Sequence, residues 1–403
     1  MAHVLIGFAE ALAAPESFFS LHRAGHTVSA FARPGSRAPA ARHLPLHRLH
    51  ALTAPESDAA AATAELAALL TGPEAPEVVL PLDDAALWLV TRALEGMASG
   101  GGDTGEGVRI AGGTGAAARV ALDKSAQIAA AARAGLAVPD TVTVRAPGDL
   151  RAALPLPAIA KPALAVSPRG AGLDKGRSHI LAGPDDAAAL AESLDPHMAP
   201  LLVQPLIRGT GEGVFGFAGA GGVSHWSGHR RLRMMNPHGS GSSACISARP
   251  EPALRDAVAA FIADIGWRGP FMVELLRDGA GTAWFMELNG RMWGSLALAR
   301  GQGLEYPAWA VAQARDPDFV PPAVGEAAEP LVARHLGRDL LHLLFVARGP
   351  KSPLYRADWP RLLPSMARVL RPVRGRRYNS DPDFPGFAWR DAAHTVAAAL
   401  RRR

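Results

Sequence analysis

Apolar and polar positions alternate in blocks over residues 1–115. The runs HVLIGF, HTVSAFA and EVVLPL are short and almost wholly apolar, which is typical of buried strands. Between the last two lies DAAAATAELAALL, whose length and composition favour a helix. Because strands separated by helices form parallel sheets, this part of the chain is predicted to be a small parallel α/β domain.

The pattern changes near residue 116. Strand-like and helix-like segments follow one another there without strict alternation, which favours an α+β arrangement. A proline-rich linker, DPDFVPPAVGEAAEP, then leads into a further helix, RHLGRDLLHLLFVARG. We therefore predict an α/β domain over residues 1–115, an α+β domain over residues 116–320 and a C-terminal extension over residues 321–403.

The segment 271–294, FMVELLRDGAGTAWFMELNGRMWG, predicts a hairpin of two short apolar strands around an Asp-Gly-Ala-Gly turn. Side chains alternate between the faces of a strand, so Glu287, Asn289 and Arg291 are expected on one face. Glu274 joins that face if the loop is Gly-Ala-Gly-Thr, because it then pairs directly with Glu287. A register shift of one residue would send it to the opposite face.

Two carboxylates, an amide oxygen and a guanidinium are costly to gather on one half-buried surface without a counter-ion. Mg²⁺ prefers such oxygen ligands and commonly shares its remaining positions with nucleotide phosphates. The hairpin is therefore a candidate metal site. A hairpin with a plain solvated polar face is the alternative that these residues leave open.

Composition places the chain among globular proteins. Of its 403 residues, 48% are hydrophobic and 20% are charged, as in globular proteins. This length is enough for two or three domains with a large core. No run approaches the roughly 20 apolar residues that a membrane helix requires. The single cysteine, Cys245, excludes an internal disulfide and is typical of a reducing compartment, so a cytoplasmic protein is expected.

The charged residues are unevenly chosen. The net charge is +5, and the only lysines among 42 basic residues are Lys124, Lys161, Lys175 and Lys351. In so arginine-rich a chain, these lysines are candidates for roles in which a compact ammonium is preferred to a planar guanidinium. The basic run at 371–377 and the terminal RRR are expected to be solvated, although such runs can also bind nucleic acid.

Four features follow one another along the chain. They are an aspartate–lysine pair, a lysine before a proline at a strand end, a Gln-Pro-Leu-Ile strand end and the acidic hairpin, at residues 123–124, 161–162, 204–207 and 271–294. This order and spacing resemble the ATP-grasp superfamily, in particular its carbamoyl-phosphate-synthase-like branch, over roughly residues 1–320. The resemblance implies an ATP-grasp fold preceded by a small α/β domain, with a flexible lid at about residues 141–205.

The resemblance implies roles for two lysines and for a glycine-rich flap. Lys124 and Lys161 match the lysines that hold the nucleotide phosphates, and Lys161 would also assist the phosphoryl transfer. The loop 167–178 matches the flap that closes over the phosphates, and it is longer and more basic than the usual pattern. Its expected phosphate contacts are Gly170, Gly172 and Lys175. Ordinary surface lysines and a plain surface loop are the alternatives.

Gln204, Pro205 and Ile207 match the hinge that recognises adenine. The carbonyl of Pro205 would accept a hydrogen bond from the adenine amino group, because proline lacks only its N–H, and the N–H of Ile207 would donate one. Glu212 matches the carboxylate that commonly binds the ribose.

In the hairpin, Glu274, Glu287 and Asn289 match the ligands of two Mg²⁺ ions, with Mn²⁺ as an alternative metal. Arg291 matches the arginine that steadies the transferring phosphoryl group or the acyl phosphate. The chain has glycine where the family pattern has proline between the asparagine and this arginine.

The stretch 229–233 and the loop 238–243 resemble the segments that line the substrate side of such enzymes. Arg231 is the first candidate there for an anion clamp. Alternate arginines along a strand can otherwise be one solvated face.

The resemblance implies an ATP-dependent carboxylate–amine (or thiol) ligase. ATP would phosphorylate a carboxylate to an acyl phosphate, ADP would leave, and an amine would displace phosphate to give an amide. A bicarbonate-using carboxylase or carbamoyl-phosphate-type enzyme is the nearest alternative, and a nucleotide-gated, basic nucleic-acid-binding protein is one of another class. The expected partners are a small-molecule carboxylate and an amine. The sequence identifies neither, and it leaves open whether residues 321–403 cap the site or form a homodimer interface.

Overall fold

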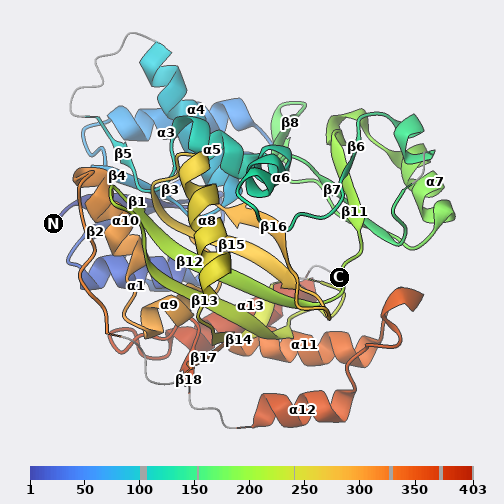
Figure 1. Ribbon diagram of the computed structural model, residues 1–403. Coiled ribbons are helices and arrows are strands. Elements are labelled where there is room, and N and C mark those ends of the chain that lie inside the picture. Colours follow the sequence, from blue (N-terminus) through green and yellow to red (C-terminus); the bar gives the residue numbers. More distant parts are fainter. Residues whose placement is uncertain (100–106, 152–153, 240, 326–329, 372–374, 402–403) are drawn as a thin grey trace.

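The computed structural model describes residues 1–99, 107–151, 154–239, 241–325, 330–371 and 375–401 (Figure 1). It contains a five-stranded parallel sheet near the N-terminus, a four-stranded antiparallel sheet, a mostly antiparallel seven-stranded sheet, a two-stranded hairpin and a group of C-terminal helices. The predicted combination of α/β and α+β architecture is confirmed.

The N-terminal sheet is parallel throughout, in the order β3-β2-β1-β4-β5. Its strands are β1 (His3–Gly7), β2 (Thr27–Ala32), β3 (Leu49–Ala51), β4 (Val78–Pro81) and β5 (Arg109–Ile110). Its helices are α1 (Ala14–Arg23), α2 (Pro39–His43), α3 (Ala59–Thr71) and α4 (Asp84–Ser99). In β1, Val4 and Ile6 pack on the side of α1, whereas Leu5 packs on the side of α3 and α4. Burial on both faces explains why the inner strands β1, β2 and β4 are largely apolar.

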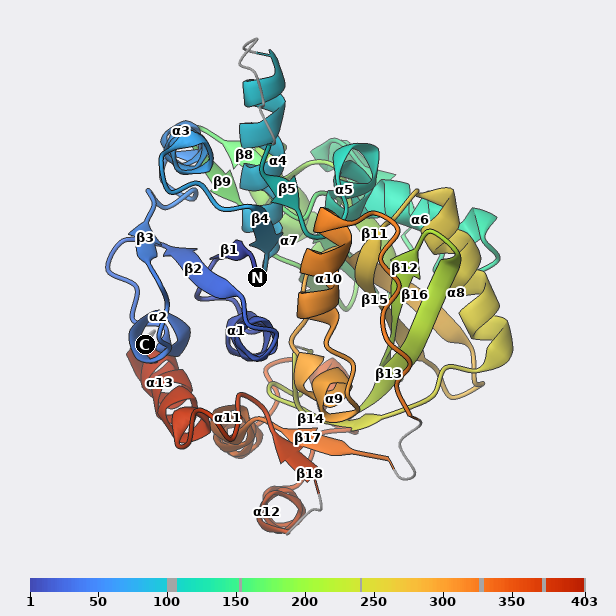
Figure 2. The same ribbon diagram turned by 90° about the vertical axis from the view of Figure 1, so that its left-hand side faces the viewer.

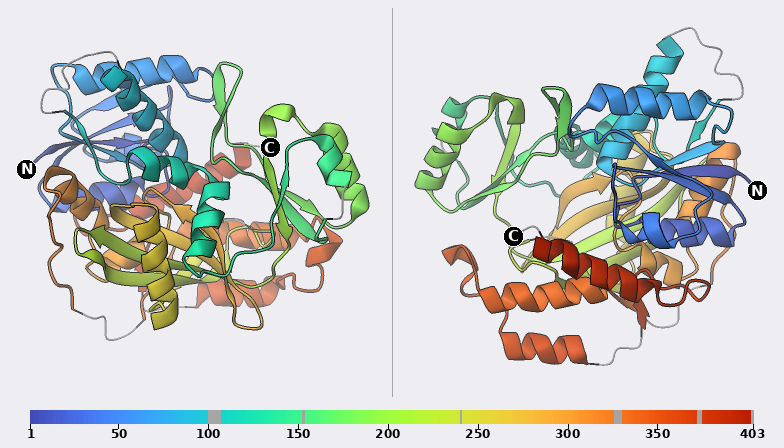
Figure 3. Two further views of the ribbon diagram at one scale, coloured as in Figure 1. Left: turned by 45° about the horizontal axis from the view of Figure 1, so that its top comes forward. Right: turned by 180° about the vertical axis from the view of Figure 1, so that it is seen from behind.

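A four-stranded antiparallel sheet, in the order β10-β7-β11-β6, projects from one side of the molecule (Figure 3). We call it the lid sheet. Its elements are β6 (Val142–Val144), η1 (Pro147–Arg151), β7 (Ala158–Pro162), β10 (His179–Leu181), α7 (Pro184–Ser193), η2 (Pro196–Met198) and β11 (Leu201–Pro205). Between β7 and β10, a hairpin of β8 (Ser167–Arg169) and β9 (Gly172–Asp174) occupies the predicted flap.

The central sheet has seven strands, in the order β16-β15-β12-β13-β14-β17-β18. They are β12 (Thr210–Gly219), β13 (Gly222–Met234), β14 (Ser242–Ser247), β15 (Gly269–Arg277), β16 (Ala283–Asn289), β17 (Val332–Arg334) and β18 (Gly375–Arg377). One face packs on α5 (Gly115–Leu122), α6 (Lys124–Arg133) and α8 (Pro252–Asp264). The opposite face packs on α1, α9 (Leu296–Gly301) and α10 (Tyr306–Arg315), so it is buried against the N-terminal part.

The C-terminal extension is built into this sheet. β17 pairs antiparallel with β14, and β18 pairs parallel with β17. The helical elements of the extension are α11 (Leu336–Arg348), η3 (Pro353–Tyr355), α12 (Leu362–Leu370) and α13 (Phe387–Arg401). α13 packs against α11 and reaches α2 of the N-terminal part (Figure 2). The boundaries near residues 115 and 320 remain predictions, because the three parts share their packing.

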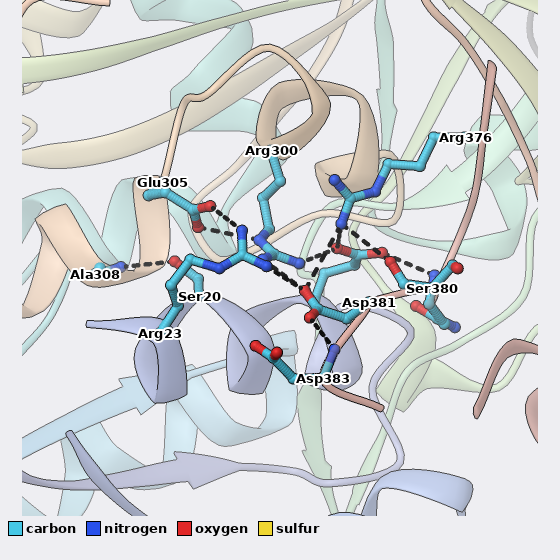
Figure 4. Close-up of polar contacts among 11 residues, drawn as sticks. Ser20, Arg23, Arg300, Glu305, Ala308, Arg376, Ser380, Asp381 and Asp383 are labelled. Carbon is cyan, nitrogen blue, oxygen red and sulfur yellow. Dashed lines mark hydrogen bonds and ion pairs between the residues drawn. The ribbon is translucent and has the colours of Figure 1, made fainter. Parts of the chain in front are cut away.

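A buried group of charges joins the N-terminal part to the extension (Figure 4). The guanidinium of Arg300, fully buried at the end of α9, lies 2.6 Å from Glu16 of α1, 3.0 Å from Glu305 and 3.2 Å from Asp381. Arg376 of β18 donates to the carbonyl of Ser380 and lies 3.9 Å from Asp381. The expectation that the basic run 371–377 is solvated is therefore wrong for Arg376, which faces inward.

Among the helices that the structure describes, none combines the length and apolar character needed to cross a bilayer.

Candidate active site

The acidic hairpin is formed by β15 and β16. Glu274 lies directly opposite Glu287, as predicted, and Arg277 pairs with Ala283. The turn is one residue longer than Gly-Ala-Gly-Thr, and a β-bulge beside Glu274 shifts the register by one residue. The bulge therefore brings the two carboxylates face to face.

A cavity of about 290 Å³ lies over this hairpin. Side chains predicted from separate motifs line it together with one aspartate that sequence reasoning missed: Lys124, Lys161, Lys175, Glu274, Glu287, Asn289, Arg291 and Asp84. They come from α6, the lid sheet, the flap, the hairpin and α4.

Local structure explains how the two lysines reach the cavity. Asp123 caps α6 by accepting from the backbone N–H of Ser125 at 2.8 Å, which fixes Lys124 in the first turn. The N–H of Lys124 donates to the carbonyl of Ala163, just beyond β7, at 2.8 Å. Lys161 stands at the end of β7, only 8% exposed, with Nζ 3.5 Å from the carbonyl oxygen of Met286. The start of α6 and the end of β7 are thus joined, and both ammonium groups line the same cavity.

The charges of the cavity perturb one another. Burial raises the pKa of Glu274, repulsion by Glu287 adds to the rise, and Arg231, whose Nη2 lies 2.5 Å from Glu274 Oε1, opposes it. Burial lowers the pKa of Lys161, and attraction by Glu287 partly offsets that shift. Two carboxylates that repel each other in a buried cavity would be stabilised by a cation.

The donor set suits a hard cation that keeps other ligands. Within the described residues, no three His, Cys, Asp or Glu side chains gather as a metal site. Glu274, Glu287 and the buried Asn289 instead offer two carboxylates and an amide oxygen on one cavity wall. Mg²⁺ is typically held by one or two carboxylates together with substrate phosphates and water, so these residues fit it.

Asp84 joins the N-terminal part to the hairpin and the flap. It opens α4 directly after β4, and its carboxylate accepts from Nε of Arg291 at 3.1 Å and from Nζ of Lys175 at 3.4 Å. Burial favours the neutral form, but Arg291 and Lys175 outweigh it and lower the pKa of Asp84 to about 2. An acidic residue at the carboxyl end of a parallel strand is a signal that could have found it, since ligands bind at that edge.

A larger cavity of about 1350 Å³ adjoins the first and shares with it the walls formed by Lys175, Glu274, Glu287, Asn289 and Arg291. The predicted hinge residues line it together with three apolar side chains: Gln204, Pro205, Ile207, Ile159, Ile180 and Met286. Apolar side chains beside the end of a strand suit a flat heterocyclic base.

Other predicted nucleotide contacts lie elsewhere. Glu212 is outside the walls of both cavities, and its carboxylate accepts from Nε of Arg277 at 3.0 Å. Gly170 lies in the turn of the flap and Gly172 begins β9, and both are outside the walls of the two cavities. The flap rests on the N-terminal part instead, where Leu173 N–H donates to the Pro55 carbonyl at 2.7 Å. The roles given to these three residues remain predictions.

Residues of the predicted substrate side, from the stretch 229–233, also line the larger cavity. Arg231, the predicted anion clamp, lines it but is paired with Glu274. Nδ1 of His229 lies 2.7 Å from Oγ of Ser295, and burial, assisted by Arg231, lowers the pKa of His229 to about 3. This histidine is therefore neutral. Arg338 of α11, which the sequence did not single out, lines the same cavity.

Several solved structures share the fold of this chain. Neither a family model nor a curated protein sequence matches the chain. An L-amino acid ligase from Bacillus licheniformis matches with a TM-score of 0.58 at 18% identity, over 78% of this chain and 74% of that one. A biotin carboxylase from Campylobacter jejuni matches with a TM-score of 0.62 at 16% identity, over 82% and 75%. A carboxyaminoimidazole ribonucleotide synthase from Aspergillus clavatus, complexed with ATP, matches with a TM-score of 0.61 at 16% identity, over 82% and 81%.

These neighbours are ATP-grasp enzymes, and the chain has the ATP-grasp fold. The resemblance drawn from the four motifs is confirmed at the level of the fold. Identities of 13–18% across the neighbours leave substrates and reaction to be argued from the residues of this chain.

Proposed function

We propose that this protein is an ATP-dependent ligase that joins a carboxylate to an amine (or thiol) through an acyl phosphate. The observation that carries the proposal is the convergence of Lys124, Lys161, Glu287, Asn289 and Arg291 on one cavity that adjoins an apolar hinge slot. Few binding sites need two ammonium groups, a cation site and a base slot together, but a nucleoside triphosphate needs all three.

In the proposed first step, a carboxylate oxygen attacks the γ-phosphorus of ATP. The bond from that phosphorus to the β,γ-bridging oxygen breaks, and its electron pair leaves with ADP. Lys124 and Lys161 counter the phosphate charge, and Arg291 steadies the acyl phosphate once it exchanges Asp84 for that anion. Glu274, Glu287 and Asn289 would hold Mg²⁺, which supplies further neutralisation of the phosphates when bound. Two ions rather than one, and Mn²⁺ in place of Mg²⁺, remain predictions.

In the second step, the amine nitrogen attacks the acyl carbon and gives up a proton, and the bond to the phosphate oxygen breaks. Water must be kept out until then, because it would hydrolyse the intermediate. The flap and the lid sheet are the elements placed to exclude it, since Lys175 and Gly176 of the flap already line the smaller cavity.

A screen of carboxylates against amines, followed by ADP release, tests the proposal. We expect ADP and phosphate to form only when both substrates are present. Glu287→Gln, which removes one proposed ligand charge at constant size, should lower turnover by about a hundredfold or more. Glu192→Gln, on the exposed face of α7, is the matched control and should turn over normally. Release of AMP and pyrophosphate, or full activity of Glu287→Gln, would contradict the mechanism.

A bicarbonate-using enzyme is the second candidate, because one neighbour is a biotin carboxylase domain complexed with MgADP and bicarbonate. Bicarbonate-dependent ADP release without any organic acid would select it.

A further inference from the structure

Arg338 reaches the substrate side from the C-terminal extension. It lies in the first turn of α11 and lines the larger cavity together with Arg231 and Arg233. Its Nη1 donates to the carbonyl of Ser242 at 3.2 Å, and that is the one side-chain hydrogen bond it makes within the described residues. A Cβ at Gly241 would lie 2.7 Å from the same nitrogen, so the neighbouring loop is shaped around the guanidinium.

The other arginines of this region already have carboxylate partners. Arg231 is paired with Glu274 at 2.5 Å. Asp339 forms ion pairs with both Arg233, at 2.6 Å, and Arg334, at 2.8 Å. Arg338 differs from them, because no ion pair within 4.0 Å joins it to any carboxylate of the described chain.

The one carboxylate whose charge acts on Arg338 is engaged elsewhere. Asp391 accepts from Nε2 of His335 at 3.0 Å and from Nδ2 of Asn379 at 2.9 Å. Burial is the largest influence and lowers the pKa of Arg338, the attraction of Asp391 offsets that shift only in part, and repulsion by Arg231 lowers the pKa slightly further. A mostly buried guanidinium without a counter-charge is costly, and an anion delivered by a ligand would remove that cost.

We propose that Arg338 binds a second anionic group of the substrate, so that the acid activated by this protein carries a carboxylate or a phosphate besides the carboxylate that is phosphorylated. That the acid has a carboxylate that becomes phosphorylated rests on the proposed function. That it carries a second anionic group rests on Arg338 alone. In this arrangement the C-terminal extension supplies a specificity residue, and Arg338 holds the end of the acid that does not react.

Direct binding tests this inference without requiring turnover. Butyrate, succinate and 3-phosphonopropionate share their length and one carboxylate, and they end in a methyl group, a carboxylate and a phosphonate. We expect calorimetric titration of the full chain to give affinity for at least one dianion about tenfold or more above that for butyrate. Which dianion is preferred distinguishes a second carboxylate from a phosphate.

Arg338→Met should abolish that preference and leave the affinity for butyrate unchanged, whereas Arg338→Lys should restore part of it. Arg348→Met is the matched control, because Arg348 is an exposed residue on the same helix, and it should keep the preference. Thermal unfolding of each variant checks that α11 still folds. Equal affinity of the wild-type protein for all three acids, or an unchanged preference in a folded Arg338→Met variant, would overturn the inference.

The two proposals fail in different ways. If no acid supports ADP release but Arg338→Met still loses its preference for a dianion, the ligase mechanism is wrong and the anion site stands. If monocarboxylates support ADP release as well as diacids do, the ligase stands and the anion site does not.

Discussion

Lys161 carries a buried ammonium group whose pKa is shifted in opposite directions by burial and by a neighbouring carboxylate. Burial lowers its pKa, the carboxylate of Glu287 raises it, and its hydrogen bond to the carbonyl oxygen of Met286 is long, at 3.5 Å. A buried ammonium that has lost its hydrating water is strongly stabilised when phosphate oxygens accept hydrogen bonds from it.

We predict that Lys161→Met weakens ATP binding by about 10- to 100-fold, because charge-assisted hydrogen bonds to phosphate are lost. Nucleotide titration under equilibrium conditions measures the loss. Lys351→Met is the control, since Lys351 is exposed and lines neither cavity. Equal ATP affinity of the two variants would remove Lys161 from the phosphate site.

His229 links stability to pH. Its pKa is lowered to about 3 in the folded protein, against 6.5 as the ordinary value. Between these values the unfolded chain binds a proton that the folded chain does not, so stability falls as the pH falls from about 6.5 toward 3. At about 1.4 kcal/mol per pKa unit the effect reaches several kcal/mol.

We predict that His229→Gln flattens this part of the stability profile. Urea unfolding at pH 7 and pH 5 measures the difference for each protein. His197→Gln, at an exposed position of η2, should keep the wild-type slope. A slope in His229→Gln as steep as that of the wild-type protein would show that other groups cause the acid sensitivity.

At the scale of elements, the flap is held by the N-terminal part rather than by a nucleotide. Leu173 N–H donates to Pro55 O, and Ala59 N–H donates to Ala171 O at 2.8 Å. A Cβ on Gly172 would lie 2.1 Å from the carbonyl oxygen of Glu56, so only glycine permits this approach. The flap therefore has a defined resting place in addition to any closed one.

We predict that Gly172→Ala releases the flap from this place. Trypsin should then cut at Arg169, Lys175 or Arg177 several-fold faster than in the wild-type protein, since exposed mobile loops are the preferred cleavage sites. Gly148→Ala, where an added Cβ meets nothing within 4 Å, is the control. Cleavage at the wild-type rate in Gly172→Ala would show that the contact with Glu56 does not hold the flap.

At the scale of the whole molecule, the buried charges around Arg300 join three segments that are distant in sequence. Glu16 belongs to α1, Arg300 to α9 and Asp381 to the extension, and Arg23 adds a pair with Asp381 at 2.8 Å. Removing one member leaves the others buried and unbalanced.

We predict that Arg300→Met lowers the free energy of unfolding by about 3–5 kcal/mol, as expected for breaking a buried pair. Arg315→Met breaks a pair with Glu77 that is about half exposed, and it should cost at most about 1 kcal/mol. Denaturant unfolding compares the two variants. Similar small losses in both would show that the buried charges contribute little.

The extension is the part of the molecule that sequence reasoning described least. A chain ending in basic runs suggested a solvated tail or a nucleic-acid contact. Arg376 instead lies in the buried charge group, and the guanidinium carbon of Arg377 lies 5.1 Å from the ring centre of Trp389. Its interactions make Arg376 a poor candidate for a phosphate contact on a nucleic acid, whereas Arg377 is exposed.

The sequence by itself determined the class of fold and most of the chemical groups of the site. Strand and helix periodicity is local, so the parallel N-terminal sheet and the hairpin could be predicted from neighbouring residues. The scarce lysines and the acidic hairpin were visible for the same reason, since each motif is a few residues long.

Only the tertiary structure decided which groups meet. Asp84 meets Arg291 from 207 positions away, and Arg338 lines the larger cavity because β17, which directly precedes α11, pairs with β14 in the central sheet. Glu212 accepts a hydrogen bond from Arg277, because the register of two paired strands determines which side chains are neighbours. Contacts of this kind depend on how separate elements pack, and no local pattern of residues records them.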